Sequence, residues 1–324
     1  MDRVWVKAGA RLHLGQLDLN GSLNRMYGGF GLALDRPGIE LIAQKHNGLC
    51  LICPGEEKRL EQIARQYLEH YSLPGVKIQL KQLIPSHAGF GSGTQLALAI
   101  GRAITNLYGL TPSPEELAGV TDRENSRSGL GIAAFFQGGF LVDGGISMPY
   151  AAERINKPPP ILARLPFPDE WSVILALPHG NNKMFGVREI EAFRALPPME
   201  EQVSGRICRL LLMKLLPGLA EKNLPAFGQG LSEIQACVGE YFAAVQGGRF
   251  ACAEGERMAE CFNNLGLSGV GQSSWGPAVY GFCEKENQES LLEEARRQAG
   301  TNVSVWASAG NNNGAAWGRA GEEI

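Results

Sequence analysis

Apolar and polar residues alternate along much of the first half of the chain, with the two-residue period of strands that bury one face. The alternation predicts strands at residues 3–8, 10–19 and 76–85, and shorter apolar runs predict strands at 49–53 and 138–145. We therefore expect a sheet to make up most of this half.

Helical periodicity interrupts these strands. Residues 57–73 and 94–109 carry apolar side chains three and four positions apart, which is typical of amphipathic helices. The turn-forming residues 36–38 predict a hairpin that joins residues 30–35 to 39–44.

Two further expectations concern the end of this half. Ser113 is expected to cap a short helix, and residues 126–135, which are rich in serine and glycine, are expected to form a loop. The proline-rich stretch at 151–168 then predicts a boundary between two domains, residues 1–165 and 166–324.

The second domain is expected to be an α/β unit that is separate from the strand-rich first half. Its strands are expected at residues 171–178 and 301–309, and its helices at 186–195, 200–216, 219–246, 256–266 and 288–300.

Composition narrows the classes of function. The 324 residues carry a formal net charge of −3, which does not suggest the clustered basic face of a nucleic-acid-binding protein. No stretch approaches the roughly 18 apolar residues of a membrane span, and the first residues lack the layout of a signal peptide. We expect small-molecule partners and no nucleic acid or membrane.

The seven cysteines are scattered and odd in number, which favours reduced thiols and a cytoplasmic location. Cys50 and Cys53 form a CxxC pair, but no second pair or histidine cluster accompanies it. Buried, inert thiols therefore explain this pair better than a zinc or redox site does.

A glycine-rich loop separates the strand at 76–85 from the helix at 94–109. Gly89, Gly91 and Gly93 stand directly before the helix, where backbone N–H groups and the helix dipole attract an anion. Ser92 and Thr94 add hydroxyl groups that can reach a phosphate oxygen or Mg²⁺. A plain strand–helix turn is the alternative, because neither the Walker nor the Rossmann pattern is present.

Three stretches resemble the motifs of the GHMP kinase superfamily, in the same order along the chain. They are PSHAGFGSGTQ at residues 85–95, ARLHLGQLDLNG at 10–21 and GLSGVGQSSWGPAVYGF at 266–282. The resemblance implies a two-domain α+β fold with an N-terminal domain that carries the phosphate loop and a ferredoxin-like C-terminal domain.

Further stretches resemble one family within this fold, the β-ribofuranosylaminobenzene 5′-phosphate synthases. They are YGGFGLALD, SRSGLGIAAFFQGGFLVDGG and ALPHG, at residues 27–35, 126–145 and 176–180. The resemblance implies a methanopterin-pathway enzyme that joins 5-phosphoribosyl-1-pyrophosphate to 4-aminobenzoate or 4-hydroxybenzoate and releases CO₂ and pyrophosphate. It also implies Mg²⁺ without an organic cofactor, and a homodimer.

One departure separates the chain from the kinases that it resembles. Many of them carry a catalytic aspartate in the segment that aligns with residues 126–135, where this chain has Gly131. An ATP-dependent small-molecule kinase remains the alternative, because phosphoryl transfer relies mainly on positioning and charge stabilisation. A non-catalytic sensor of a sugar or phosphate is a third, weaker alternative.

The candidate site residues come from these motifs and from nearby cations. Arg11, His13, His87 and Arg127 are the candidates for catalysis. The candidates for binding substrate or phosphate are Lys7, Arg25, Gly89, Gly91, Ser92, Gly93, Thr94, Arg123, Gln272, Ser273, Ser274 and Trp275, and those for Mg²⁺ are Ser92 and Asp143.

Several of these residues have ordinary structural explanations. Arg11 and His13 also fit the solvated face of a strand, and Arg123 and Arg127 fit a solvated helix end. Trp275 stacks on an aromatic acid in the functional interpretation and packs in the core in the structural one. Asp143 similarly fits either a metal ligand or a turn.

Overall fold

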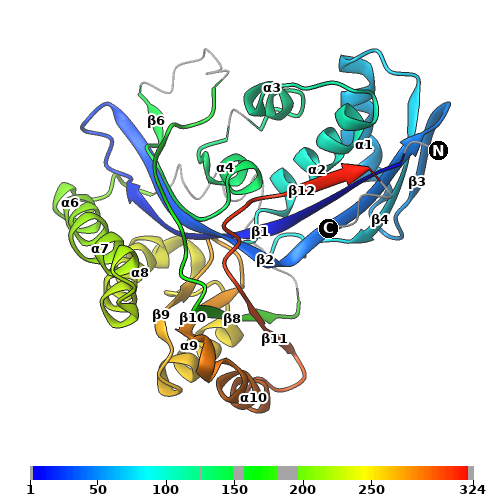
Figure 1. Ribbon diagram of the computed structural model, residues 1–324. Coiled ribbons are helices and arrows are strands. Elements are labelled where there is room, and N and C mark those ends of the chain that lie inside the picture. The colour runs from blue at the N-terminus through cyan, green and yellow to red at the C-terminus, as the bar shows by residue number, and fades with distance from the viewer. Residues whose placement is uncertain (1–2, 124–125, 149–156, 181–195, 320–324) are drawn as a thin grey trace.

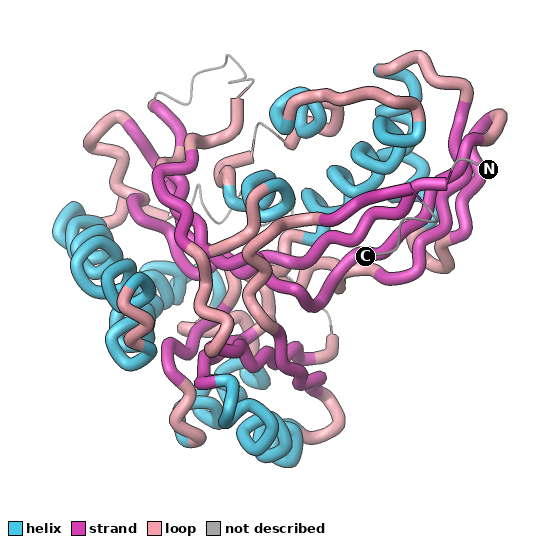
Figure 2. Tube along the Cα trace, in the orientation of Figure 1, coloured by secondary structure: helices cyan, strands magenta, loops and turns pink. Residues whose placement is uncertain are grey.

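The computed structural model describes residues 3–123, 126–148, 157–180 and 196–319, and two sheets organise them (Figure 1). The larger sheet belongs to the N-terminal half and carries helices α1 to α4 along one face, while the smaller sheet lies below it with its own helices (Figures 1 and 2).

Eight strands form the larger sheet, whose main path runs β12-β1-β2-β4-β3, with β5, β6 and β7 attached beyond β2. The strands are β1 (Arg3–Asp18), β2 (Arg25–Lys45), β3 (Gly48–Ile52), β4 (Gly75–Gln82), β5 (Phe140–Asp143), β6 (Ile146–Ser147), β7 (Ile161–Leu165) and β12 (Ala316–Arg319).

The predicted hairpin at residues 36–38 is wrong. β2 runs through these residues as one strand, and β1 pairs with both of its halves, for example Lys7 with Glu40 and Arg11 with Ala33. The register shifts between Gly9 and Arg11. The proline–glycine signal therefore marks a bulge, because β1 is long enough to hold both halves of β2 in one ladder.

The helices of the N-terminal half are α1 (Glu57–His70), α2 (Ser92–Leu107), α3 (Pro114–Gly119) and α4 (Leu130–Phe136). The cap at Ser113 is confirmed, since its side chain accepts a bond from the backbone N–H of Glu116 in a capping box. The expected loop at 126–135 is wrong in its second part. Leu130 and Ile132 are buried, and this burial stabilises α4 there.

The smaller sheet has the strand order β11-β8-β10-β9 and is antiparallel throughout. In chain order this is the 4-1-3-2 arrangement of a ferredoxin-like unit, so that prediction is confirmed. Its strands are β8 (Trp171–Pro178), β9 (Ser268–Gln272), β10 (Val279–Glu284) and β11 (Val303–Ser308).

The helices of this half are α6 (Glu201–Leu210), the π-helical segment Leu211–Leu215, α7 (Leu216–Ala220), α8 (Leu224–Gln246), α9 (Ala253–Asn264), the 3₁₀ turn Lys285–Asn287 and α10 (Gln288–Ala299). The helix predicted at 186–195 lies outside the described residues. Strand β12 was not predicted, and it returns the chain to the first sheet beside β1.

One apolar core joins the two sheets. The ring of Phe227 on α8 lies 6.1 Å from Phe140 of the first sheet and 5.1 Å from Phe282 of the second, measured between ring centroids. Phe227 and Phe140 have no exposed surface. This packing fixes the second domain against the first, and the candidate site lies where the two meet.

No described helix is long and apolar enough to cross a membrane. The seven cysteines are all free thiols, and Cys53 of the CxxC pair is buried while Cys50 is half-buried.

Candidate functional site

The three motifs that are distant in sequence meet at the glycine loop. The backbone N–H of Arg11 on β1 donates to the carbonyl of Phe90 at 3.1 Å, and its guanidinium Nη1 donates to Gly89 at 2.9 Å. From the second domain, the hydroxyl of Ser273 donates to the same Gly89 carbonyl at 2.8 Å and accepts the backbone N–H of His13 at 3.1 Å. The loop is thus held from both domains.

Close packing explains two of the loop glycines. Gly89 has a φ of 90°, and a Cβ there would lie 2.2 Å from the carbonyl oxygen of Ser273. Gly91 has a φ of 72°, and a Cβ there would lie 3.1 Å from Cγ of Arg11. Both positions therefore require glycine for the fold itself, whether or not a ligand is bound.

The third loop glycine, Gly93, lies next to two arginine side chains. The place of a Cβ on Gly93 lies 3.6 Å from Nη1 of Arg123 and 3.7 Å from Nη2 of Arg59. Gly93 is the second residue of α2, whose first N–H groups have no partners within the helix. This end of the loop, with Ser92 before it and Thr94 after it, combines helix-end donors with two guanidinium groups and suits a phosphate.

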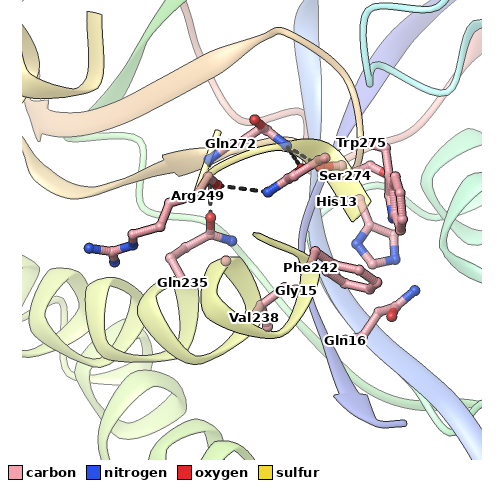
Figure 3. A pocket seen from close by; sticks show the side chains of 12 residues that line it. His13, Gly15, Gln16, Gln235, Val238, Phe242, Arg249, Gln272, Ser274 and Trp275 are labelled. Atoms are coloured by element: carbon pink, nitrogen blue, oxygen red, sulfur yellow. Dashed lines mark hydrogen bonds between the residues drawn. The ribbon is translucent and has the colours of Figure 1, made fainter. Parts of the chain in front are cut away.

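A small pocket lies on the second-domain side of His13 and is partly open to solvent. The aromatic rings of His13, Phe242 and Trp275 gather at one side, and Arg249 extends away at the other (Figure 3). Glutamine amides supply most of the polar groups. The lining residues of this kind are Gln16, Gln235, Gln246 and Gln272.

His13 is a neutral side chain in this pocket wall. It is 7% exposed, and burial together with the nearby Arg11 charge lowers its pKa to about 3. A neutral imidazole can donate and accept one hydrogen bond each, but it holds no extra proton at neutral pH. The interpretation of Arg11 and His13 as a solvated strand face is therefore wrong for His13.

Gly131 faces the loop directly. A Cβ at this position would lie 3.1 Å from Cγ2 of Thr94, and the Gly131 carbonyl accepts a bond from Gln95 at 2.8 Å. Gly131 thus lies against the start of α2, which leaves little room there for any side chain.

Two predicted binding residues point elsewhere. Lys7 is exposed and lies over the Trp5 ring, in a separate hollow with Glu40 and Asn311. Lys7 lies four positions before Arg11 on the same strand, a rise of about 13 Å. The guanidinium of Arg25 bonds to the carbonyls of Gly144 and Gly145 and to Ser147. Both predictions are corrected: Lys7 lies outside the site, and Arg25 fixes the β5–β6 turn.

The Mg²⁺ prediction for Asp143 is also corrected. Asp143 has no exposed surface, and its carboxylate accepts bonds from the Ser128 hydroxyl and from the N–H groups of Gly129 and Gly145. Burial raises the pKa of this carboxyl, while these bonds oppose the shift. Asp143 therefore organises the turn before α4.

The side chains near the loop do not form a binding site for a metal ion held by the protein alone. No group of three His, Cys, Asp or Glu side chains converges among the described residues. Ser92 at the start of α2 is 8% exposed, and a hydroxyl alone does not hold Mg²⁺. We derive no step of the reaction through a metal.

The remaining predicted residues have different surroundings. His87 is exposed in the loop with a φ of 58°, and the guanidinium of Arg127 stacks over Tyr27 at 5.7 Å. Ser273 is fully buried, so it positions the loop, whereas Gln272 and Ser274 line the pocket. Trp275 is 5% exposed and packs edge-on against Phe242 at 4.6 Å, which leaves only part of its ring at the pocket wall.

Sequence reasoning missed the residues that α1 and α8 bring to the site. Arg59 on α1 and the residues Gln235, Phe242 and Gln246 on α8 belong to helices with no glycine motif. Gln235 and Gln246 on α8 and Gln272 on β9 could have indicated a polar pocket. The sequence does not show, however, that α8 packs against β1, which completes the pocket.

Two sequence profiles match the chain. The GHMP kinases N-terminal domain matches residues 58–139, and the GHMP kinases C-terminal domain matches residues 215–302. Among solved structures, homoserine kinase from Cytophaga hutchinsonii has a TM-score of 0.67 at 17% identity and covers 98% of each chain. Lactococcus lactis galactokinase has a TM-score of 0.68 at 13% identity, covering 97% of this chain and 95% of that one. These structures show the fold.

Curated relatives place the chain more narrowly. The β-ribofuranosylphenol 5′-phosphate synthase of Archaeoglobus fulgidus is 38% identical over 85% of this chain and 86% of that protein. The protein of the same name from Methanocaldococcus jannaschii is 32% identical over 87% and 90%, respectively. The chain is therefore an enzyme of the GHMP kinase fold and belongs to the β-ribofuranosylphenol 5′-phosphate synthase family.

Proposed function

We propose that this enzyme joins 5-phosphoribosyl-1-pyrophosphate to a 4-substituted benzoate and releases CO₂ and pyrophosphate, as a step of methanopterin biosynthesis. Similarity to relatives named for a ribofuranosylphenol 5′-phosphate product is the observation that carries the proposal. That product corresponds to 4-hydroxybenzoate as the acceptor, and 4-aminobenzoate is the second candidate.

The loop end of the site supports a diphosphate leaving group. Guanidinium groups of Arg11, Arg59 and Arg123 lie around Gly91 and Gly93, at the N-terminal end of α2. Negative charge builds up on the pyrophosphate as its bond to the ribose carbon breaks. Fixed cations and helix-end N–H groups stabilise that charge without reorganisation, which lowers the barrier.

The neighbouring pocket supports an aromatic acceptor. Its walls combine the Phe242 and Trp275 rings with amides and a neutral His13, and the described residues that line it include no acidic side chain. Such a wall accepts a flat ring and can bond a hydroxyl or amino substituent through uncharged groups. Among the described residues that line this pocket, Arg249 is the cation, and from the side opposite the aromatic rings it suits the acceptor's carboxylate (Figure 3).

The reaction needs no protein base at Gly131. The ring carbon that bears the carboxylate attacks C1 of the ribose as the C1–oxygen bond to pyrophosphate breaks. Loss of CO₂ then returns its bonding electrons to the ring and restores aromaticity, so no net proton is exchanged. A kinase that acts on an alcohol must instead dispose of a hydroxyl proton, and a glycine cannot accept it.

The test measures both products. The purified protein is incubated with 5-phosphoribosyl-1-pyrophosphate and carboxyl-labelled 4-hydroxybenzoate or 4-aminobenzoate, with and without Mg²⁺, and released CO₂ is counted against pyrophosphate. Equal release that requires both substrates is the expected result. If neither benzoate leads to release of CO₂ and pyrophosphate, and the protein turns over ATP with small alcohols, the kinase is favoured instead.

A further inference from the structure

Arg59 and Arg123 converge on one empty point in front of α2. They come from different elements: Arg59 lies on α1, and Arg123 follows α3, where its backbone N–H bonds to Ala118 at 3.0 Å. Their terminal nitrogens lie 3.7 and 3.6 Å from the place where a Cβ of Gly93 would be. Two like charges that approach one point repel each other unless an anion lies between them.

Neither backbone conformation nor packing explains the glycine at position 93. Its φ is not positive, unlike those of Gly89 and Gly91. Among the described residues outside α2, the two guanidinium groups are the nearest neighbours of a Cβ there, at an ordinary contact distance. These neighbours would accept an alanine, so packing among the described residues does not account for the glycine.

The two guanidinium groups keep donors for such a ligand. Arg59 uses Nη1 to bond Ser86 at 2.7 Å and to approach Glu56 at 3.6 Å, which leaves its Nη2 toward Gly93. Nε of Arg123 is buried and bonds to no described residue. Burial and the charge of Arg59 lower the pKa of Arg123, while the neighbouring Asp122 opposes the shift.

We propose that Arg59 and Arg123 bind the terminal phosphate of the diphosphate group, in the space kept open by Gly93. This proposal deepens the proposed function, since it assigns a position to the leaving group. The two arginines and the N–H groups of the first α2 turn supply the positive charge there, so a carboxylate-held metal is not needed for binding. Arg59 has no role in any of the glycine motifs and acts from a separate helix.

Inorganic pyrophosphate is the probe, because its binding does not depend on catalysis. Titration calorimetry on the full-length protein is run without divalent cations, at low and at raised ionic strength. Arg59→Gln and Arg123→Gln each remove one charge-assisted contact, and we expect each to weaken binding by about tenfold or more. Arg59→Lys restores binding only in part, because an ammonium group lacks the planar fork.

Two further variants separate the binding site from general damage. Gly93→Ala fills the space without straining the backbone, and we expect weaker pyrophosphate binding with an unchanged unfolding midpoint. Arg65→Gln removes an exposed arginine of the same helix that pairs with Glu61, and we expect unchanged binding. Equal affinities for wild type, Arg59→Gln and Gly93→Ala would overturn the proposal, as would a wild-type protein that does not bind pyrophosphate.

The outcome is distinguishable from that of the proposed function. Pyrophosphate binding that depends on Arg59, without CO₂ release from either benzoate, would uphold this site and reject the synthase reaction. CO₂ release with the same KM for 5-phosphoribosyl-1-pyrophosphate in wild type and in Arg59→Gln would uphold the synthase reaction and reject this site.

Discussion

Ser273 donates a hydrogen bond to the carbonyl of Gly89 at 2.8 Å, across a separation of 184 residues and between the two domains. The same hydroxyl accepts the backbone N–H of His13 at 3.1 Å, so one buried side chain fixes the glycine loop and the pocket wall together. The relative position of the glycine loop and the pocket wall therefore depends on the contact between the domains.

Ser273→Ala tests this dependence. The change leaves the buried N–H of His13 without this acceptor, whereas the Gly89 carbonyl keeps its bond from Arg11, and we expect the free energy of unfolding to fall by about 1–3 kcal/mol. KM for 5-phosphoribosyl-1-pyrophosphate should rise as well, because the loop is less well held. Urea unfolding and initial rates measure the two effects. Ser290→Ala, which removes an exposed hydroxyl on α10, is the matched control and should change neither.

Burial of His13 predicts how stability depends on pH. Its folded pKa of about 3 is below the ordinary 6.5, so between these values the unfolded chain binds a proton that the folded chain does not. Stability therefore falls as the pH is lowered from 6.5 toward 3, by up to a few kcal/mol from this residue. The loss should be smaller in His13→Gln, as measured by denaturant unfolding at a series of pH values. Equal slopes for both proteins would contradict the prediction.

Asp143→Ala should affect stability rather than metal binding. The change removes the acceptor for three hydrogen bonds that organise the turn before α4, and we expect a loss of about 2–4 kcal/mol in the free energy of unfolding. The Mg²⁺ dependence of turnover should remain that of the wild type. A large rise in the Mg²⁺ concentration needed for half-maximal rate, with unchanged stability, would return Asp143 to the role of a metal ligand.

Local signals predicted most elements, and tertiary pairing decided the exceptions. The strand at 171–178 and the cap at Ser113 follow from periodicity and side-chain chemistry within a few residues. Residues 36–38 carry a turn signal, but the length of β1 on the neighbouring strand decides that β2 continues. Strand β12 has four residues and follows a glycine- and asparagine-rich stretch, and its pairing with β1 makes it a strand.

The same distinction applies to the site. The glycine loop and the Gln272–Trp275 segment could be predicted because each motif carries its own chemistry. Arg59 could not, because nothing near it in sequence shows that α1 places its guanidinium before α2. Conversely, Lys7 and Arg25 are cations that lie near a motif in the sequence, and their actual neighbours are visible only in the folded sheet.

The contact between Gly131 and Thr94 allows a paired test of how closely α4 approaches the loop. Gly131→Ala places a methyl group 3.1 Å from Cγ2 of Thr94, and we expect it to lower the free energy of unfolding by about 1–3 kcal/mol and to reduce kcat/KM. Thr94→Ser removes that Cγ2 and keeps the hydroxyl. Because the colliding atom is then absent, the double variant should regain most of the stability and activity that Gly131→Ala lost. Additive losses in the double variant, measured by urea unfolding and initial rates, would show that the effect of Gly131→Ala arises from the α4 backbone and not from the contact with the loop.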